Sequence, residues 1–377
     1  MSKLDELIAE FCPDGVEFVE LNEVLDYEQP TKYIVKSTNY DDSYTIPVLT
    51  AGQSFVLGYT NEDFGIYKAS PDSPVIIFDD FTTSFHWVDF NFKVKSSAMK
   101  MLRSKDNEIA NLRFLFHLMK NINYIPVDHS RQWIGKYSKF RIPLPPLPVQ
   151  QEIVRILDNF TELTAELTTE LTAELTARRK QYEYYRDFLL TFGDEVEWTT
   201  LGEVAINLDS KRKPVAKGKR KAGEYPYYGA SGIVDYVDDY IFDGDYLLVS
   251  EDGANLVARV TPIAFSASGK IWVNNHAHVL EFETYEDRKF IEYYLNMIDL
   301  SRFLSTAAQP KLTQENLNKI PVPAPSFEEK ERIVAILDRF DALCNDLTSG
   351  IPAEIEARQK QYEYYRDKLL SFKEVTA

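Results

Sequence analysis

One tyrosine-rich sequence occurs twice in this chain of 377 residues. It reads ARRKQYEYYRDFLLTF at residues 177–192 and ARQKQYEYYRDKLLSF at residues 357–372, with thirteen of sixteen positions identical. The two copies are 180 residues apart, almost half the length of the chain. Repetition at a fixed spacing indicates a chain built from two copies of one structural unit.

Three further segments recur at the same or nearly the same spacing. They are VEFVELNEV (16–24) and VEWTTLGEV (196–204), IVRILDNF (153–160) and IVAILDRF (333–340), and the proline-rich joints IPLPPLPVQQE (142–152) and IPVPAPSFEEKE (320–331). Each unit is therefore a variable region, a joint and a long helix. The repeated parts must do the same thing twice, whereas the variable parts can act on different targets.

Both variable regions are predicted to be small α+β domains. Runs of apolar and β-branched residues predict strands, and a period near 3.6 predicts helices. The expected strands lie at 73–81, 91–102, 245–253, 261–273 and 277–283, and the expected helices at 108–122 and 287–298.

Each joint is followed by a long amphipathic helix. The first has apolar residues at helical spacing from Ile153 to Phe192 with no break before Gly193. The second begins near Ser326, is interrupted at Ser349–Pro352 and then restarts, with Pro352 in its first turn. Helices of this length must bury their apolar stripe, so we expect an antiparallel coiled coil with a pseudo-two-fold internal repeat. The alternative is two unrelated surface helices on one core.

A four-residue unit repeats nearly perfectly at 161–176, in TELTAELTTELTAELT. Each unit adds about 6 Å of helix, which is typical of a spacer whose length changes in whole units. The alternative is a low-complexity tract without functional consequence. The predicted organisation has five segments: an N-terminal segment at 1–30, domains at 31–147 and 196–322, and helical segments at 148–195 and 323–377.

The net charge of −17 argues against nucleic-acid binding by the chain as a whole, but basic residues are concentrated locally. Seven of the eleven residues from Lys211 to Lys221 are basic. The alternative for this segment is a solvated loop. Two distant cysteines and the absence of a long apolar run favour a cytoplasmic protein with no membrane span.

Motifs for chemistry are missing: there is no P-loop, no zinc-type Cys/His spacing and no amino-methyltransferase motif. His276 and His278 can pair on one strand face, for which a structural or phosphate-contacting role is favoured over a metal site. Asp79 and Asp80 are expected to accept hydrogen bonds in a loop, or to read a cytosine amino group, rather than act as nuclease carboxylates. We predict no catalytic residue and no metal site in this chain.

Residues suited to binding DNA are more frequent than catalytic motifs in both variable regions. Basic side chains neutralise phosphates, and amides or hydroxyls form hydrogen bonds with base edges. The candidates in the first region are Lys32, Lys36, Gln53, Asn61, Thr82, Thr83, Ser84, His86, Lys93, Lys95, Lys100, Lys105 and Arg131. Those in the second are Lys211, Arg212, Lys213, Lys217, Lys219, Arg220, Lys221, Asn255, Arg259, Lys270 and Lys311. The candidates for helix packing or partner docking are Tyr182, Tyr185, Leu189, Tyr362, Tyr365 and Leu369.

The duplicated joints and QYEYYRD helices, together with YYGASGIVDYVDDYIF and VNNHAHVL in the second half, resemble the specificity subunits of Type I restriction–modification systems over the whole chain. The resemblance implies two target recognition domains, each reading one half of a bipartite double-stranded DNA site. It also implies helices that fix the gap and dock two methyltransferase subunits, with motor-nuclease subunits joining through them. The chain itself would have no cofactor; S-adenosylmethionine, ATP and Mg²⁺ would belong to the partners.

Two alternatives to this function have different requirements. A recognition module of another defence or modification complex would have the same architecture and no nuclease partner. An enzyme with its own cleavage or methyl-transfer activity would need a cofactor or carboxylate motif, which the sequence lacks.

Overall fold

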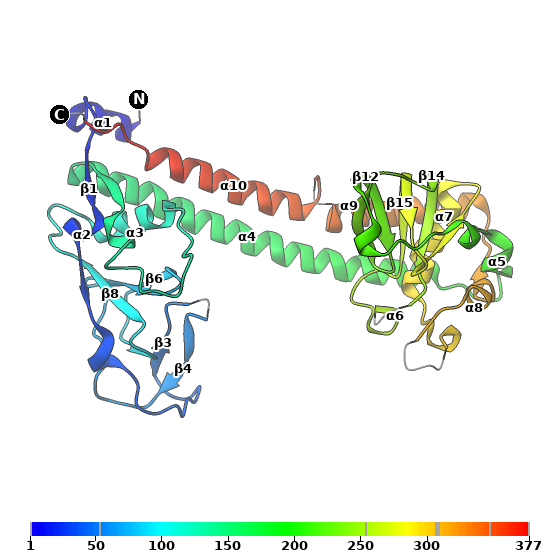
Figure 1. The fold of residues 1–377 in the computed structure, drawn as a ribbon, viewed down its shortest axis with the longest axis horizontal. Helices are drawn as coiled ribbons and strands as arrows, with labels where there is room; N and C mark the ends of the chain where they lie inside the picture. The colour runs from blue at the N-terminus through cyan, green and yellow to red at the C-terminus, as the bar shows by residue number, and fades with distance from the viewer. Residues whose placement is uncertain (1, 53, 253–254, 306–309, 347, 376–377) are drawn as a thin grey trace. The chain divides into compact units, whose positions relative to one another are not determined.

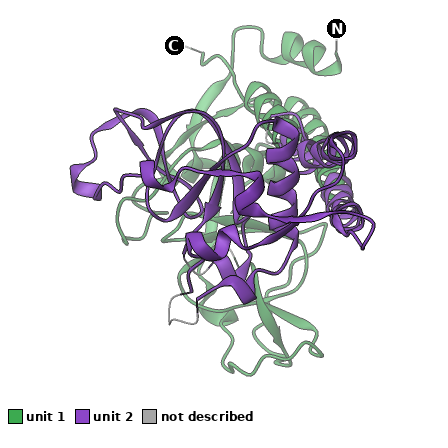
Figure 2. Cartoon of the chain, turned by 90° about the vertical axis from the view of Figure 1, so that its right-hand side faces the viewer, with its two compact units in different colours: residues 1–169, 356–377 green, residues 170–355 purple. Residues whose placement is uncertain are grey.

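The computed structural model describes residues 2–52, 54–252, 255–305, 310–346 and 348–375. The chain forms two compact units, distinguished by colour in Figure 2: unit 1 comprises residues 1–169 and 356–377, and unit 2 comprises residues 170–355. Each unit combines a mixed α+β domain with segments of the long helices (Figure 1), as the sequence predicts. The predicted division into five segments is finer than these two units and stays a prediction.

The domain of unit 1 contains two sheets besides a short joint. A four-stranded sheet has the order β2-β8-β5-β6 and a three-stranded sheet the order β4-β3-β7. The elements are α1 (Lys3–Phe11), β1 (Glu17–Glu20), α2 (Leu21–Val24), β2 (Leu25–Glu28), β3 (Ile46–Leu49), β4 (Val56–Thr60), β5 (Val75–Asp79), β6 (Phe85–Val88), β7 (Lys93–Val94), β8 (Met99–Ser104), α3 (Leu112–Asn121) and β9 (Arg141–Leu144).

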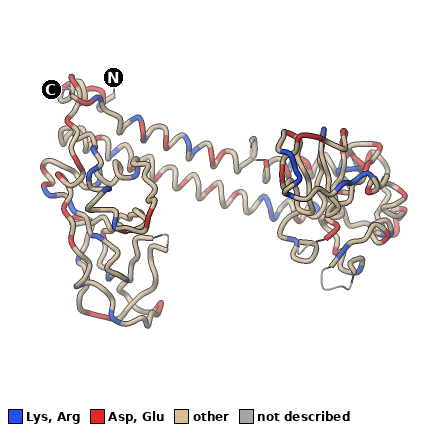
Figure 3. Tube along the Cα trace, in the orientation of Figure 1, with Lys and Arg blue, Asp and Glu red and all other residues tan. Residues whose placement is uncertain are grey.

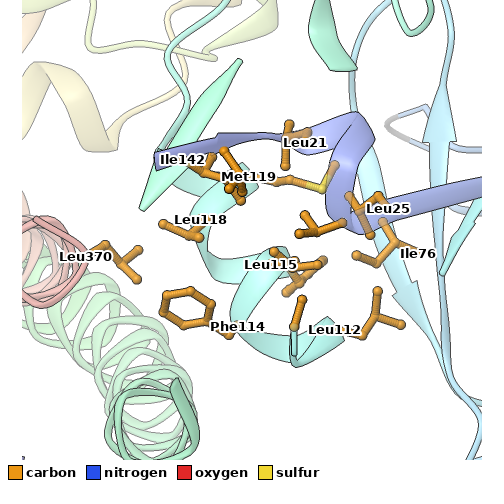
Figure 4. Packing of buried hydrophobic residues seen from close by; sticks show 14 of the residues in the cluster. Leu21, Leu25, Ile76, Leu112, Phe114, Leu115, Leu118, Met119, Ile142 and Leu370 are labelled. Atoms are coloured by element: carbon orange, nitrogen blue, oxygen red, sulfur yellow. The ribbon is translucent and has the colours of Figure 1, made fainter. Parts of the chain in front are cut away.

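Helix α3 supplies the core of unit 1. Its buried residues, among them Phe114, Leu115 and Leu118, pack against the four-stranded sheet on one side and the long helix on the other. Figure 4 shows these side chains between Ile76 of β5 and Leu370, which follows α10. The N-terminal segment joins the same cluster through Leu4, and the C-terminal segment through Leu370.

Unit 2 builds a single larger sheet. Its six strands have the order β11-β16-β14-β15-β12-β13, with only β12 and β15 parallel. The elements are β10 (Trp198–Thr200), α5 (Leu201–Val204), β11 (Ile206–Asn207), β12 (Ala222–Gly229), β13 (Gly232–Val237), β14 (Phe242–Ser250), α6 (Asn255–Ala258), β15 (Ala264–Val273), β16 (Ala277–Glu281), α7 (Tyr285–Met297), α8 (Gln314–Asn318) and β17 (Pro321–Pro323).

The proline-rich joints form matching two-stranded ladders. In unit 1, β1 pairs antiparallel with β9, and in unit 2, β10 pairs antiparallel with β17. The first strand of each pair comes from the repeated VEFVEL or VEWTTL segment and the second from the proline-rich segment. Proline is tolerated here because a two-stranded ribbon leaves one edge of each strand without a partner.

The long helices are α4 (Leu147–Leu190, 44 residues), α9 (Phe327–Asn345) and α10 (Ile351–Leu369). The interruption before Pro352 is found where the sequence predicts it. Gly350 lies in this break, where a Cβ atom would come within 2.6 Å of the carbonyl oxygen of Ala342. None of the helices in the described ranges is long and apolar enough to cross a membrane.

The long helices pair antiparallel within each unit. In unit 1, Phe160 contacts Tyr365 and Thr161 contacts Tyr362, so α4 and α10 run in opposite directions. In unit 2, Tyr185 stacks on Phe340 at a centroid distance of 5.5 Å. Arg179, nearer the start of α4, lies close enough to Cys344, nearer the end of α9, for its charge to oppose the rise in the pKa of the thiol that burial causes. Because the contacts advance along α9 as they go back along α4, these two helices also run in opposite directions. The predicted antiparallel pairing is confirmed in both units.

An aspartate of the repeated ILD sequence attaches each long helix to its domain. Asp158 on α4 accepts hydrogen bonds from Arg113 Nε and His117 Nε2 of α3, both at 2.9 Å. Asp338 on α9 accepts from the hydroxyls of Tyr285 and Tyr293 of α7, at 2.7 and 2.6 Å. Equivalent carboxylates therefore hold equivalent helices, with different donors in the two units.

Protonation opposes the contact in unit 1. Burial disfavours the charged carboxylate of Asp158, but the His117 bond and the Arg113 charge outweigh burial and lower its pKa below 3.8. Burial lowers the pKa of His117 below 6.5, so the ring is neutral at neutral pH. Neutral His117 stabilises the folded unit above pH 6.5, and this stabilisation is lost as the pH falls from 6.5 through the lower pKa of His117 in the folded protein. The charge of Asp158 also stabilises the folded unit, and its contribution is lost as the pH falls below 3.8 and through the lowered pKa of the carboxyl.

Replacing Asp158 with asparagine tests this contact. We expect Asp158→Asn to destabilise the attachment of α3 by about 1 kcal/mol at pH 7, because a charge-assisted bond is removed and His117 keeps a weaker acceptor. Hydrogen exchange of the α3 amides should then be about fivefold faster. The difference from the unsubstituted chain should shrink below pH 3.8, where that chain also loses the charge. Asp187→Asn removes an exposed charge and is the control; unchanged α3 exchange in Asp158→Asn would contradict the assignment.

Candidate nucleic-acid interface

In unit 1 a tight loop joins β5 to β6. Asp79 Oδ1 accepts hydrogen bonds from the backbone N–H groups of Phe81 and Thr82, and these bonds shape the turn. Thr83 has a left-handed backbone with φ of 61°, which a β-branched residue rarely adopts. Asp79 therefore has the loop-forming role expected for it.

The polar side chains of this loop are partly engaged within the domain. Ser84 Oγ donates to the carbonyl of Ala51, and His86 Nε2 lies 3.0 Å from the carbonyl oxygen of Gly52 while its ring stacks on Phe55. Thr82 is exposed, whereas Thr83 is buried. Thr82 is thus the most accessible member of this predicted group, although its hydroxyl lies 2.6 Å from that of Ser84.

Two of the predicted phosphate contacts are buried lysines. The Lys93 side chain is 0% exposed and pairs with Glu62 at 3.0 Å, and its Nζ also donates to the carbonyl of Phe64. The Lys100 side chain is 0% exposed and lies 3.4 Å from Asp80 Oδ2. Their charges balance carboxylates inside the domain, so this placement argues against a DNA contact, and we leave both out of the proposed interface.

The remaining candidates of unit 1 are exposed, apart from Gln53, which lies outside the described residues. They are Lys32, Lys36, Asn61, Lys95, Lys105 and Arg131. Some already have neighbours: Lys32 pairs with Glu28 at 2.7 Å, and Lys105 donates to the carbonyl of Asn22 at 2.6 Å.

The basic segment of unit 2, residues 211–221, contains arginines that are bound within the domain and lysines that are exposed (Figure 3 marks both residue types). Arg212 binds Glu251 at 2.8 Å and Arg220 binds Asp235 at 3.0 Å, so both arginines stabilise the fold of the segment. Lys221 is exposed and lies 3.8 Å from Asp238. The exposed lysines that take part in no ion pair within the described ranges are Lys211, Lys213, Lys217 and Lys219.

Asn255 and Arg259 have internal roles. The amide of Asn255 both donates to the carbonyl and accepts from the N–H of Thr261, which joins the two ends of residues 255–261. Arg259 donates to the carbonyls of Leu295 and Ile298 at the end of α7. These side chains are occupied, which argues against the predicted base or phosphate contacts. Lys270 is exposed and lies over the ring of Tyr240, and the Lys311 side chain is 44% exposed.

His276 and His278 are held by carboxylates. His278 is buried between Asp209, 2.6 Å from Nδ1, and the carbonyl of Leu312, 2.7 Å from Nε2. His276 Nδ1 lies 3.0 Å from Asp252. Burial disfavours the charged form of Asp209, but the bond from His278 outweighs it and lowers the pKa of the carboxyl. His278 therefore has a structural role, which is the favoured interpretation of the sequence.

The six predicted helix residues all make contacts within their own unit, although Tyr185 (37%) and Tyr365 (40%) remain partly exposed. Leu189 is buried in the core of unit 2, Tyr182 packs against that core, and Leu369 packs against the core of unit 1. Tyr185, Tyr362 and Tyr365 take part in the helix pairs described above. The most exposed aromatic residues of the repeats were not predicted: Tyr184 (65%), Phe188 (66%) and Tyr364 (63%). Tyr184 and Tyr364 are equivalent and lie off the apolar stripe, a signal that could have identified them.

A second unpredicted surface lies beside the β5–β6 loop. Phe81 and Thr82 line a hollow of about 300 Å³ with residues from Pro126 to His129. Val127 in this segment is 90% exposed, and nearby Ile125 is 79% exposed. Ile125 and Val127 flank a single proline, Pro126, and give no periodic pattern, so the sequence did not indicate them.

Comparison with known proteins places the chain in a family. The pattern of the Type I restriction modification DNA specificity domain matches residues 13–177 and 193–357, once in each half of the chain. The specificity subunit of the Type I restriction enzyme EcoR124I/EcoR124II of Escherichia coli is 43% identical over 99% of this chain and 97% of its own length. That of the E. coli enzyme EcoprrI is 39% identical over 56% of this chain and 55% of its own length.

Two solved structures share the fold at low identity. One is a chain from work on complex assembly and conformational transition of the type I R-M system, with TM-score 0.62, 17% identity and coverage of 95% of this chain and 98% of that one. The other is the S subunit from M. genitalium, with TM-score 0.54, 16% identity and coverage of 94% and 96%. Two matches to the family pattern, one in each repeat, identify this chain as a member of the Type I restriction–modification DNA specificity subunits, which are recognition subunits and not enzymes.

Proposed function

We propose that this chain selects a bipartite double-stranded DNA site, with the domain of each unit reading one half. The long helices set the gap between the halves and dock two methyltransferase subunits, through which motor-nuclease subunits join. The observation that carries the proposal is the internal repeat, in which the joints, the long helices and the Asp158/Asp338 contacts are duplicated around dissimilar sheets. Identical docking elements suit two copies of one partner, and different domains suit two different half-sites.

The proposal assigns the chemistry to the partners. S-adenosylmethionine belongs to the methyltransferase subunits, which flip the target adenine out of the helix for N6-methylation. ATP and Mg²⁺ belong to the motor-nuclease subunits. This chain supplies position and sequence selection, in the cytoplasm, with the recognition domains at about 31–147 and 196–322.

A second candidate is a recognition module of another defence or modification complex without a nuclease partner. Single-molecule sequencing of DNA from cells that express this chain with a methyltransferase partner distinguishes the candidates. A split motif with N6-methyladenine in both halves is the expected result. An assembled complex that leaves no new methylated motif would instead favour the second candidate.

The four-residue units predict the length of the gap. Deleting Thr168–Leu171 removes about 6 Å of helix, and a base-pair step is about 3.4 Å, so the gap should shorten by about one to two base pairs. Replacing Thr168, Thr169 and Glu170 by alanine keeps the helix length and should leave the gap unchanged. The same methylated motif after the deletion would show that the units do not act as a spacer.

The exposed lysines of unit 2 predict salt-dependent binding. Charge reversal at Lys211, Lys213, Lys217 and Lys219 should weaken binding of the assembled complex to its target. The slope of log K against log salt should become less steep by about 0.9 for each DNA phosphate that the variant no longer neutralises. Titrations at several salt concentrations measure the slope. An unaltered slope would assign the segment to a solvated loop.

The exposed tyrosines predict the docking surface. Tyr184→Ala together with Tyr364→Ala should weaken methyltransferase binding by tenfold or more, since exposed aromatic residues that anchor an interface typically contribute about 2 kcal/mol. Glu183→Ala with Glu363→Ala changes neighbouring exposed positions and serves as the control. Equal affinity of both double variants for the methyltransferase would exclude Tyr184 and Tyr364 from the interface.

A further inference from the structure

An exposed cation lies against a buried carboxylate at the end of an interior strand in each unit. In unit 1, Arg131 Nη1 lies 3.8 Å from Oδ2 of Asp80, the residue after β5. In unit 2, Lys311 Nζ lies 3.3 Å from Asp252 Oδ2 and 3.9 Å from Glu251 Oε1, on the two residues after β14. Arg131 and Lys311 are separated by 311 − 131 = 180 residues, the offset of the repeat.

The backbone around the two cations also matches. The N–H of Gln132, next to Arg131, donates to the carbonyl of Asp80 at 2.8 Å. The N–H of Leu312, next to Lys311, donates to the carbonyl of Glu251 at the same distance. The chain therefore passes the end of the interior strand in the same way in both units, although the sheets differ.

Burial separates the anchor from the cation. The side chains of Asp80 and Asp252 are 1% and 8% exposed, whereas those of Arg131 and Lys311 are 51% and 44% exposed. Lys100, which is buried, faces Asp80 from inside the domain at 3.4 Å. At Asp252 the second neighbour is His276, whose half-exposed ring lies 3.0 Å away. Each carboxylate therefore has a second partner, and the exposed heads of Arg131 and Lys311 can also face an anion at the surface.

A residue with a left-handed backbone lies between each of these strands and the next strand of its domain. Thr83, in the loop after β5, has φ of 61°, and Arg259, which directly follows α6, has φ of 52°. They are the two non-glycine residues with positive φ in the described parts of the chain. Such conformations persist only where the surrounding structure holds them, and they concentrate at binding sites.

We propose that Arg131 and Lys311 are anchored phosphate contacts, each binding the DNA backbone of the half-site that its domain reads. Arginine and lysine differ in hydrogen-bonding geometry and share only their positive charge. A group shared by two domains that read different sequences must contact a part of DNA that is independent of sequence, and phosphates have that property. Each contact would fix the register of its domain on the DNA, so that other side chains of the domain can reach the base edges. This inference rests on the proposed function.

The test uses the full chain assembled with its methyltransferase partner and DNA carrying the methylated motif. Arg131→Ala and Lys311→Ala should each weaken binding about tenfold and reduce the steepness of the salt dependence by about 0.9. Target DNA with a single uncharged methylphosphonate, placed at each phosphate in turn, locates the contact. One position in one half-site should weaken binding by the unsubstituted complex but not by the Arg131→Ala complex, and Lys311→Ala should behave likewise in the other half.

Matched controls come from the repeat itself. Arg141 and Lys319 are exposed, ion-paired and equivalent to each other in the two joints, but their partners, Glu374 and Glu315, are exposed and not buried. Their alanine variants should keep the full methylphosphonate effect. Arg131→Gln and Lys311→Gln keep a long polar side chain and give the same readout where an alanine variant fails to assemble.

The outcomes separate the inference from the proposed function. If the unsubstituted complex binds a split site but Arg131→Ala and Lys311→Ala keep its salt slope and its methylphosphonate profile, the anchored contacts are refuted and the proposed function stands. Equal losses in the Arg141 and Lys319 controls would also refute them, because the effect would then be that of any basic residue. If the unsubstituted complex selects no split site, the proposed function itself fails.

Discussion

The carboxylates of Asp158 and Asp338 join the long helix of each unit to its α+β domain. These two parts differ in how much their sequences can change. The long helix must keep one surface for its helical partner, whereas the domain must be free to vary. A helix of this length is stable only while its apolar stripe is buried, and Ile153 and Leu157 in unit 1, or Ile333 and Leu337 in unit 2, bury it against the domain helix. The aspartate next to that stripe fixes the angle of contact through directional hydrogen bonds.

The donors to these aspartates show how the domains can diverge in sequence while each keeps its contact with the long helix. Unit 1 uses an arginine and a neutral histidine, and unit 2 uses two tyrosines. Four- and three-stranded sheets in unit 1 correspond to one six-stranded sheet in unit 2, yet both place an interior strand, β5 or β14, with a carboxylate directly after it. The constant elements are thus a joint, a helix contact and a strand end, between which the loops can change.

Structural elements that are repeated in the chain, or that have a periodic apolar pattern, can be predicted well from the sequence. The long helices, the break before Pro352, α3 and α7, and the strands around 75–79 and 242–250 follow from apolar spacing and punctuation by glycine and proline. The roles of charged residues were predicted less well. In the sequence, Lys93 and Arg259 cannot be distinguished from surface cations. In the fold, β4 and the turn after it bring Glu62 to Lys93, and the end of α7 supplies the carbonyl groups that Arg259 binds. Partners distant in the sequence decide whether a cation is free, and local composition does not contain that information.

A net charge of −17 is compatible with DNA recognition, because charge acts locally at a protein surface. Surface charges more than about 10 Å apart are largely screened at moderate salt, so the acidic residues of the helices and of the N-terminal segment act weakly on a distant DNA phosphate. Cations on the domains act at contact distance, and their effect depends on how they are held. Arg131 and Lys311 lie against buried carboxylates that limit their freedom before any ligand arrives, so binding costs less conformational entropy. An acidic protein can therefore recognise DNA with a few fixed cations in place of a large basic surface.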